Sequence, residues 1–253
     1  MNVFITGASG GMGAALARRY VSAGANVGLF ARRRAVLDPP ATAQAAGSVA
    51  AFVGDVRDAD SVARAGADFI ARYGVPDIVI ANAGISRGVL TEKAEDLPAF
   101  REVLETNVLG IVHTFQPFLP AMHAARRGTL VGIASIAGFR GLPGSAAYSA
   151  SKAAAITYLE SLRVEERDRG VAVVTICPGY VATPMTARNP YPMPFLLGAD
   201  EAARLVVRAI ERRKRFTVLP WQMALIGGLL RMLPRPLYDA AFARAPRKPR
   251  QTD

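Results

Sequence analysis

Cysteine, histidine and tryptophan are scarce in this chain of 253 residues, which contains one cysteine, two histidines and one tryptophan. A single cysteine excludes an internal disulfide and is typical of a protein that works in a reducing compartment such as the cytoplasm. Because Cys177 lies in an apolar segment, we expect it to be a small core residue without chemistry of its own. We expect no metal site.

Long apolar runs are also missing. The chain starts almost at once with the apolar run VFIT, without a basic segment before it, so we expect no signal peptide. The apolar stretch 221–233 is too short for a transmembrane helix and is interrupted by Gly227, Gly228 and Arg231. Hydrophobic residues still make up 51% of the chain, which excludes general disorder and is enough for one large α/β domain.

Acidic residues are outnumbered, 20 against 31 basic ones, which gives a formal net charge of +11. Such an excess favours nucleic acid, an anionic membrane surface or an anionic ligand as the partner. Aromatic residues are not interleaved with the basic ones on one face, and much of the charge lies at 32–34 and in the C-terminal tail. We therefore expect no nucleic-acid partner.

Strand-like and helix-like segments alternate along the chain, which predicts a doubly wound, Rossmann-type α/β fold with a parallel sheet of about seven strands and helices on both faces. We expect one catalytic domain over 1–220, and a helical extension over 221–253 packed on the same domain. Ligands of such sheets bind at the carboxyl ends of the strands. The expected strands are 2–6, 26–31, 48–56, 76–84, the run before Ser135, 171–177 and 216–220, and the expected helices are 14–24, 59–73, 98–125, 146–169 and 199–215.

A glycine-rich turn, TGASGGMG at 6–13, joins the first expected strand to the first helix. Backbone N–H groups and the helix dipole make such a turn a phosphate site. Gly7 permits the tight turn, while Gly11 and Gly13 allow a diphosphate and the neighbouring strand to come close.

The same turn contains GASGG, which also matches the G-x-S-x-G nucleophile elbow of serine hydrolases. A hydrolase of that kind needs a histidine late in the chain, but His113 and His123 both fall in an expected mid-chain helix. It also needs an earlier strand for its oxyanion hole, which cannot precede residue 7. The hydrolase is therefore a remote alternative.

The second expected strand ends at Ala31 and is followed by Arg32, Arg33 and Arg34. A site for NAD requires an acidic residue near this point, whereas a 2′-phosphate attracts guanidinium groups. The pattern favours NADP(H), although a solvated basic loop has the same sequence signature.

Ser135, Tyr148 and Lys152 form the candidate catalytic group. Lys152 follows Tyr148 by one helical turn, so the two side chains share a face, and Ser135 meets them from a strand end. A free phenol has a pKa near ~10, and a neighbouring ammonium lowers it towards the range useful for proton transfer. Since Tyr-x-x-x-Lys also occurs by chance on ordinary helices, the other motifs must decide.

Taken together, TGASGGMG, NAG at 82–84, Asn107, Ser135, Tyr148-x-x-x-Lys152 and PGYVAT at 178–183 resemble the shorter subgroup of the short-chain dehydrogenase/reductase family. The resemblance covers about residues 1–220. It implies an NADP(H)-dependent oxidoreductase that interconverts a ketone or aldehyde and an alcohol, as a homodimer or homotetramer that pairs through helices near 100–125 and 146–169.

The resemblance also implies residue roles. Tyr148 is the general acid in reduction and the base in oxidation, Lys152 lowers the pKa of Tyr148 and holds the nicotinamide ribose, and Ser135 holds the carbonyl oxygen. Asn107 binds a water that relays protons to Lys152. The cofactor-binding residues are Gly7, Ser9, Gly11, Met12 and Gly13 at the phosphates; Arg32 and Arg33 at the 2′-phosphate; Asp55 and Val56 at adenine; Asn82, Ala83 and Gly84 along the strand end; and Pro178, Gly179, Val181 and Thr183 near the carboxamide.

The substrate and the extension are less determined. The apolar, proline-rich loop 189–198 and the stretch 221–233 favour a hydrophobic carbonyl substrate. The extension fits a surface or subunit-interface helix, a lid over the substrate pocket, or an interfacial helix on anionic lipid at the inner face of a membrane. A non-catalytic NADP-binding sensor or scaffold is the main alternative function, but it predicts loss of a catalytic residue and all four are present.

Overall fold

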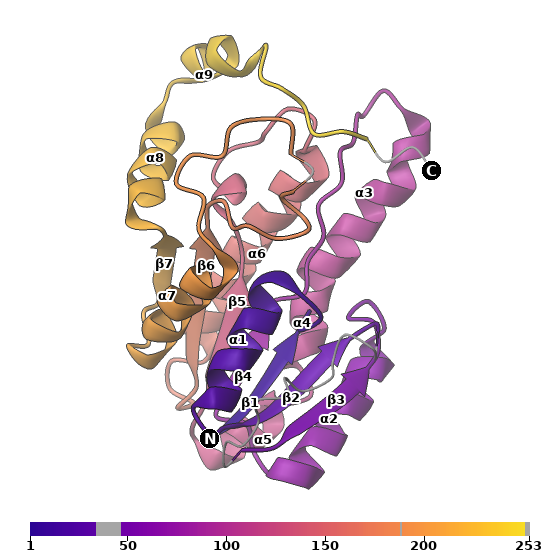
Figure 1. Cartoon of the computed structure of the whole chain (residues 1–253), viewed down its shortest axis with the longest axis vertical. Helices are drawn as coiled ribbons and strands as arrows, with labels where there is room; N and C mark the ends of the chain where they lie inside the picture. Colours follow the sequence, from indigo (N-terminus) through magenta and orange to yellow (C-terminus); the bar gives the residue numbers. More distant parts are fainter. Residues whose placement is uncertain (34–46, 188, 251–253) are drawn as a thin grey trace.

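A single sheet of seven parallel strands lies at the centre of the computed structural model, which describes residues 1–33, 47–187 and 189–250 (Figure 1). Its order, β3-β2-β1-β4-β5-β6-β7, reverses direction between β1 and β4, where open α/β sheets bind their ligands. The predicted Rossmann-type fold is confirmed. The strands are β1 (Asn2–Thr6), β2 (Asn26–Ala31), β3 (Val49–Val53), β4 (Ile78–Ala81), β5 (Thr129–Ile133), β6 (Ala172–Pro178) and β7 (Phe216–Leu219).

Alternate residues of the central strands face two separate apolar cores, as the two-residue period of a strand requires. In β1, Val3 and Ile5 pack into one core while Phe4 packs into the other. Phe4 lies at the middle of an aromatic cluster, with ring centroids 5.4 Å from Phe69 and 4.8 Å from Phe118. Both faces of the sheet are therefore covered, which explains why its strands are almost uninterrupted apolar runs.

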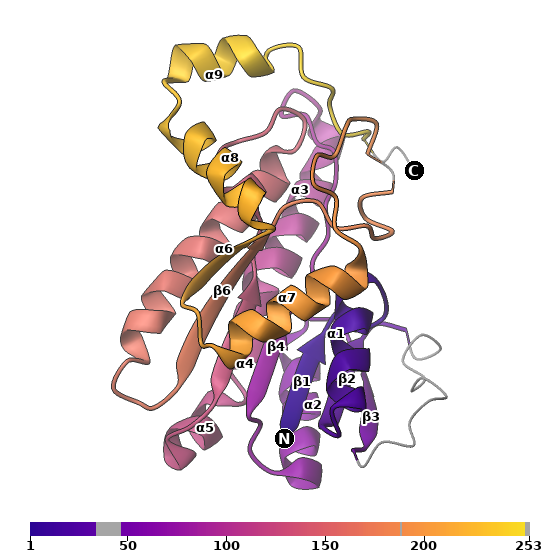
Figure 2. The same cartoon turned by 60° about the vertical axis from the view of Figure 1, so that its left-hand side comes forward.

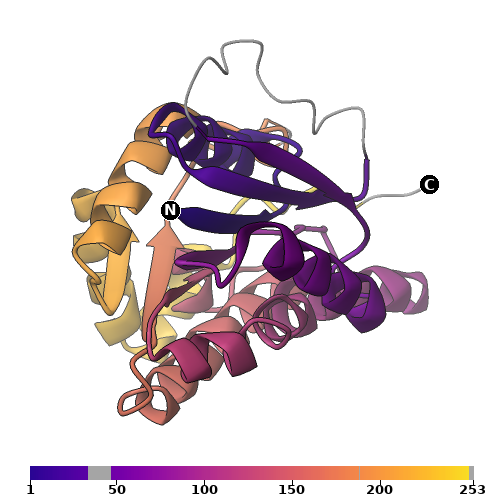
Figure 3. The same ribbon diagram turned by 90° about the horizontal axis from the view of Figure 1, so that it is seen from below.

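Helices form a layer on each face of the sheet, as the view from below shows (Figure 3). α1 (Gly11–Ser22) and α7 (Ala199–Glu211) pack together on one face. The opposite face carries α2 (Ala59–Tyr73), α3 (Leu97–Leu104), α4 (Gly110–Phe115), α5 (Leu119–Ala125) and α6 (Ala146–Glu165). The ends of α2 lie where the sequence predicted them, because both carry local capping residues. The Asp58 side chain accepts hydrogen bonds from the N–H groups of Asp60 and Ser61, and Gly74 ends the helix with φ 79°.

The single helix predicted over 98–125 is wrong. After α3 the chain makes a π-helical turn, η3 (Glu105–Leu109), and α4 then ends at Phe115. Pro117 follows, and because proline has no N–H it cannot continue the hydrogen bonding of α4. Helical structure therefore continues from α3 through η3 into α4, ends before Pro117, and starts afresh with α5 at Leu119.

The C-terminal extension leaves the sheet at β7 as α8 (Trp221–Met232) and α9 (Arg235–Phe242), and then returns across the top of the molecule towards α3 (Figures 1 and 2). Arg140 anchors it by donating to the carbonyl oxygens of Leu230 and Leu233 at 3.2 and 2.9 Å. The Tyr238 hydroxyl donates to the carbonyl of Gly141 at 2.6 Å. Within the described residues, no helix is both long enough and apolar enough to cross a membrane.

Candidate active site

A cleft of about 970 Å³ runs along the carboxyl ends of the strands. The turns that follow β1, β2, β3, β4, β5 and β6 all reach it, because parallel strands end at the same edge of a sheet. Every residue predicted to bind the cofactor or take part in catalysis lines this cleft except Asn107, which is fully buried behind it.

The glycine-rich turn forms one wall of the cleft. Gly7 has φ 67° and Gly11 has φ 52°, which are left-handed conformations that other residues rarely adopt. A Cβ at Gly13 would lie 2.3 Å from the carbonyl oxygen of Gly7, so only glycine allows α1 to approach this closely. The residue before α1, Gly10, provides no side-chain cap. The N–H groups of the first turn of α1 therefore face the cleft without a side-chain acceptor, as an anion site requires.

Basic side chains stand where the second strand ends. Arg32 and Arg33 are exposed and line the cleft, whereas Arg34 lies outside the described residues. Ala31 precedes them, so this strand end offers no carboxylate to a ribose. The hydrogen bonds and charge of Arg57, with a smaller contribution from Arg32, hold the pKa of the Asp55 carboxyl below its usual range even though its burial acts in the opposite direction.

The predicted catalytic side chains meet at the floor of the cleft. Ser135 follows β5, while Tyr148 and Lys152 lie one turn apart near the start of α6. Lys152 Nζ donates to the carbonyl of Ile133 at 2.8 Å and lies 5.8 Å from the Tyr148 ring centroid. Ser135 Oγ accepts a hydrogen bond from the N–H of Ala137 at 3.2 Å, which fixes its rotamer.

The expected lowering of the Tyr148 pKa by Lys152 is not found. Burial raises the pKa of Tyr148, and a hydrogen bond from Ser135 only partly offsets that rise. Burial also lowers the pKa of Lys152 to about 8. The physical reason is that desolvation penalises both charged forms, the phenolate and the ammonium, in the same apolar site.

Asn107 occupies the π-helical turn η3 and has no direct access to the cleft. Its Oδ1 accepts from the N–H of Ile85 at 2.8 Å, and its Nδ2 donates to the Ile85 carbonyl and to Ser151 Oγ, both at 2.9 Å. The side chain thus ties the loop after β4 to α6. π-Helical turns within α-helices are frequent at functional sites.

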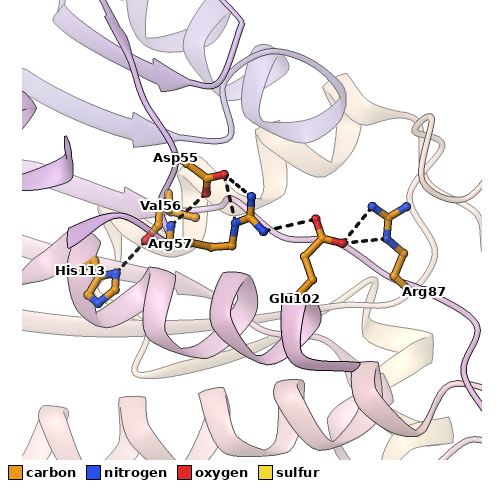
Figure 4. Close-up of polar contacts among 6 residues, drawn as sticks. All are labelled: Asp55, Val56, Arg57, Arg87, Glu102 and His113. Atoms are coloured by element: carbon orange, nitrogen blue, oxygen red, sulfur yellow. Dashed lines mark hydrogen bonds and ion pairs between the residues drawn. The ribbon is translucent and has the colours of Figure 1, made fainter. Parts of the chain in front are cut away.

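A chain of charges runs from Asp55, which follows β3, to Arg87 in the loop after β4 (Figure 4). Arg57 Nη2 lies 2.7 Å from Asp55 Oδ2, and Arg57 Nη1 lies 3.7 Å from Glu102 Oε1. The other oxygen of Glu102, Oε2, accepts from Arg87 Nη2 at 3.1 Å. His113 Nδ1 donates to the carbonyl of Val56 at 2.8 Å, which holds the strand end beside this chain.

Both histidines are engaged away from the glycine-rich turn, which removes support for the hydrolase. His113 binds Val56, and His123 Nε2 lies 2.6 Å from the buried carboxylate of Glu166. Ser9 therefore has no histidine as its base. Among the described residues, no group of three or more histidine, cysteine or acidic side chains could hold a metal ion.

Sequence analysis left a lid over the substrate pocket as one possibility for the extension, but it assigned none of the extension's residues to the cleft. Lys248, Pro249 and Arg250 line it together with Ser86 and Arg87 from the loop after β4. The only signal in the sequence was the basic character of the tail. Within the cleft, the uncapped turn, the arginines at the end of β2 and the small residues after β4 fit a phosphorylated dinucleotide.

Comparisons with known proteins agree with this geometry. A family described as short chain dehydrogenase matches residues 1–192. An uncharacterized oxidoreductase of Myxococcus xanthus (strain DK1622) is 42% identical over 247 residues, which are 95% of each chain. The solved structure of a short chain dehydrogenase from Burkholderia cenocepacia J2315 in complex with NADP gives a TM-score of 0.82 at 28% identity, covering 97% of this chain and 98% of that one. An alcohol dehydrogenase from the archaeon Thermococcus sibiricus, complexed with 5-hydroxy-NADP, gives 0.74 at 27% identity, covering 86% and 95%.

These matches extend over the same strands and turns that build the cleft, so the protein is a nucleotide-binding oxidoreductase with a Rossmann-type fold. Within that class, the chain belongs to the short-chain dehydrogenase family.

Proposed function

We propose that this protein is an NADP(H)-dependent reductase that converts a hydrophobic ketone or aldehyde to an alcohol and can run in reverse. The observation that carries the proposal is the meeting of Ser135, Tyr148 and Lys152 at the floor of a cleft whose other wall is the glycine-rich turn. A bound nicotinamide cofactor supplies the hydride, and the protein supplies orientation and proton transfer.

In reduction, the Ser135 hydroxyl donates a hydrogen bond to the substrate carbonyl oxygen. The Tyr148 phenol gives its proton to that oxygen as the carbonyl carbon is reduced, and the Lys152 ammonium stabilises the phenolate that remains. Burial raises the pKa of Tyr148 and so keeps the phenol protonated, which suits the acid role in reduction. We assign Lys152 the further task of holding the nicotinamide ribose. Asn107 orders the loop around the site and the water that serves Lys152.

The positive charge of the arginines after β2 supports a preference for NADP(H) over NAD(H). Arg32 and Arg33 line the cleft after β2, and no acidic residue replaces them there. Guanidinium groups bind a 2′-phosphate in a fork geometry, whereas a ribose diol favours a carboxylate. Two solved relatives bind NADP or a derivative of it.

The test is a panel of ketones and aldehydes of increasing apolar size, assayed with NADPH and with NADH. We expect turnover with NADPH to be much faster than with NADH, and kcat/KM to rise with apolar chain length. Equal rates with small polar carbonyls would contradict the hydrophobic substrate. Tight NADPH binding without turnover of any carbonyl or alcohol would favour the sensor or scaffold instead.

We also propose that residues 221–250 contact an anionic membrane surface from the cytoplasmic side. Four side chains of α8 at helical spacing are strongly exposed: Trp221 (68%), Leu225 (66%), Leu229 (69%) and Met232 (82%). Basic residues at 231, 235, 244 and 247 accompany this stripe, while Asp239 is the only acidic residue in 221–250. An apolar stripe with basic flanks is typical of interfacial helices on anionic lipid. The free, buried Cys177 is consistent with a reducing compartment.

Self-association is a further part of the proposal. Leu109 and Val164 expose apolar side chains on the two helical regions through which pairing is expected. Light scattering coupled to size-exclusion chromatography should give a dimer or tetramer, and a Val164→Asp variant should shift it towards monomer.

A further inference from the structure

The last described residues are seated on the cleft rather than free beside it. We call 246–250 the strap. Gly88 and Arg250 pair as a parallel β-bridge, and a Cβ at Gly88 would lie 2.3 Å from the carbonyl oxygen of Pro249. Gly144, with φ 73°, accommodates Arg247 in the same way, since a Cβ there would lie 2.8 Å from the arginine's own Cβ. Two glycines thus make room for the strap.

A charged latch holds the strap in place. Arg250 Nε lies 2.8 Å from Asp96 Oδ2, and its Nη2 lies 2.9 Å from Asp96 Oδ1 and 2.9 Å from Glu95 Oε1. Asp96 is buried and also accepts the N–H of Leu90 at 2.8 Å. Bidentate pairs of this kind fix orientation as well as adding binding energy.

Three basic side chains line this end of the cleft, and they differ in how their charge is balanced. Arg87 is paired with Glu102, and Arg250 is paired with Asp96. Lys248 donates to the neutral hydroxyl of Ser86 at 2.9 Å, and among the residues that the structure describes no carboxylate pairs with it. An ammonium has three donors, so two of those on Lys248 remain available to a ligand.

Lys248 also lies at the end of the cleft where the chemistry occurs. Its partner Ser86 follows Gly84 by two residues. A Cβ at Gly84 would lie 3.2 Å from Asn107 Oδ1 and 3.6 Å from Lys152 Nζ. We therefore place the expected substrate beside the ammonium of Lys248. Arg32 and Arg33 also line the cleft, but they follow β2, which β1 separates from β4 in the sheet.

We propose that Lys248 binds an anionic group of the substrate, a carboxylate or a phosphate, and that the substrate is an amphiphilic carbonyl compound whose charged end lies under the strap. This inference rests on the proposed function and deepens it by adding a charged group to the hydrophobic substrate. Burial and the nearby charge of Arg87 lower the pKa of Lys248, so an incoming anion would relieve a cost that is already present in the site. Lys248 is singled out as the anion-binding group because two of its N–H donors remain available, whereas the neighbouring Arg87 and Arg250 are already paired with carboxylates.

The experiment compares two matched pairs of substrates with NADPH: an oxo fatty acid against its methyl ester, and an oxoalkyl phosphate against the corresponding oxo alcohol. Wild type, Lys248→Gln and Lys248→Arg are assayed, with Arg247→Gln as the control because Arg247 is the adjacent basic residue but does not line the cleft. In wild type, kcat/KM should favour one charged compound over its neutral partner. That ratio should fall roughly tenfold in Lys248→Gln, as expected for loss of a charge-assisted hydrogen bond, and stay within about twofold in Arg247→Gln and Lys248→Arg.

A binding measurement separates this proposal from the proposed function. An unreactive fatty acid and an alkyl phosphate are titrated against the Tyr148→Phe protein with bound NADPH, and their effect on NADPH fluorescence is followed with and without Lys248→Gln. The compound whose binding weakens when Lys248 is replaced identifies the anion as a carboxylate or a phosphate. If no carbonyl is turned over at all, the proposed function fails while this titration still reports on Lys248.

Three results would overturn the inference. The first is equal use of the charged and neutral substrates by the wild-type protein, or binding of neither the fatty acid nor the alkyl phosphate in the titration. The second is a charge preference that Lys248→Gln leaves intact. The third is a Lys248→Gln variant that weakens NADPH binding instead, because Lys248 would then serve the cofactor.

Discussion

The guanidinium of Arg250 forms a two-pronged ion pair with the buried carboxylate of Asp96, a residue 154 positions earlier in the chain. The contact brings the C-terminal strap onto the helix that starts at Leu97 and places Lys248 over the cleft. The extension is thereby part of the site wall. Sequence analysis left a lid over the pocket open for this segment, and the structure shows that Lys248, Pro249 and Arg250 line the cleft.

Asp96→Asn should loosen the strap. The amide can still accept the N–H of Leu90 but loses the charge that pairs with Arg250, so trypsin should cut after Arg244 and Arg247 roughly tenfold faster, as local opening becomes more frequent. Glu95→Gln is the matched control, because Glu95 is exposed and makes a single contact with Arg250. Equal cleavage of Asp96→Asn and wild type would show that the latch does not hold the strap.

Replacing both arginines after β2, in Arg32→Ala/Arg33→Ala, should weaken NADPH binding at least tenfold and leave NADH binding nearly unchanged. The reason is that only NADPH carries the 2′-phosphate with which these guanidinium groups would pair. Fluorescence titration measures both affinities. Arg64→Ala/Arg72→Ala removes the same charge from the exposed face of α2 and should not alter the preference. If the variant binds both cofactors with wild-type affinity, Arg32 and Arg33 do not contact the 2′-phosphate.

Lys152 should make the stability of the protein depend on pH in a predictable direction. Burial lowers its folded-state pKa from 10.5 to about 8, so between these values the unfolded chain holds a proton that the folded protein has lost. Stability then rises with pH across this window, and the cost of burying the charge is fully present below about pH 8. The free energy of unfolding of wild type should therefore gain up to about 3 kcal/mol relative to Lys152→Met between about pH 7 and pH 10.5.

Urea unfolding of both proteins at the two pH values checks this, since other titrating groups are common to the pair and cancel in the difference. A difference that stays constant with pH would mean that Lys152 is not desolvated as the structure indicates.

Much of the fold was predictable because its signals are local. The ends of α2 follow from Asp58 and Gly74, and the predicted bounds of β1 and β2 are those observed. Boundaries set by long-range packing were less accurate: β3 ends at Val53, before the predicted end at residue 56, and α7 ends at Glu211 rather than 215. Pro117 was present in the sequence as a sign of a break. The helix was still predicted as continuous because the apolar periodicity of α4 carries on into α5.

The candidate site also contains residues that local sequence signals could place and residues that they could not. Residues that follow the strands could be assigned to one cleft, because parallel topology alone brings strand ends together. Lys248 could not, since its position depends on Gly88, Gly144 and Asp96, which lie far away in sequence and carry no motif. The pKa of Tyr148 was predicted in the wrong direction because spacing reveals a neighbouring ammonium but not the desolvation that outweighs it.

The exposed stripe of α8 should bind lipid. Wild type should float with vesicles that contain phosphatidylglycerol and detach at high salt, and Trp221→Ser/Leu225→Ser/Leu229→Ser should reduce the bound fraction roughly tenfold, because each apolar side chain contributes to insertion. Val53→Ser/Leu97→Ser removes exposed apolar side chains away from α8 and outside the regions 100–125 and 146–169 proposed for pairing, and is the control. Wild-type protein that binds neither anionic nor neutral vesicles would refute membrane contact. If instead the protein forms a concentration-dependent oligomer that only the α8 variant loses, the stripe packs against a second copy of the chain.

The central claim is that Tyr148 gives a proton to the substrate as hydride arrives from NADPH. Its most direct test is a single-turnover measurement of NADPH oxidation by wild type and Tyr148→Phe, with the best carbonyl of the panel and with NADPH affinity measured in parallel. Loss of an acid of this kind is worth roughly 10²–10⁴ in rate, so the variant should bind NADPH as wild type does and transfer hydride at least about a hundredfold more slowly. Hydride transfer at the wild-type rate in Tyr148→Phe would contradict the mechanism.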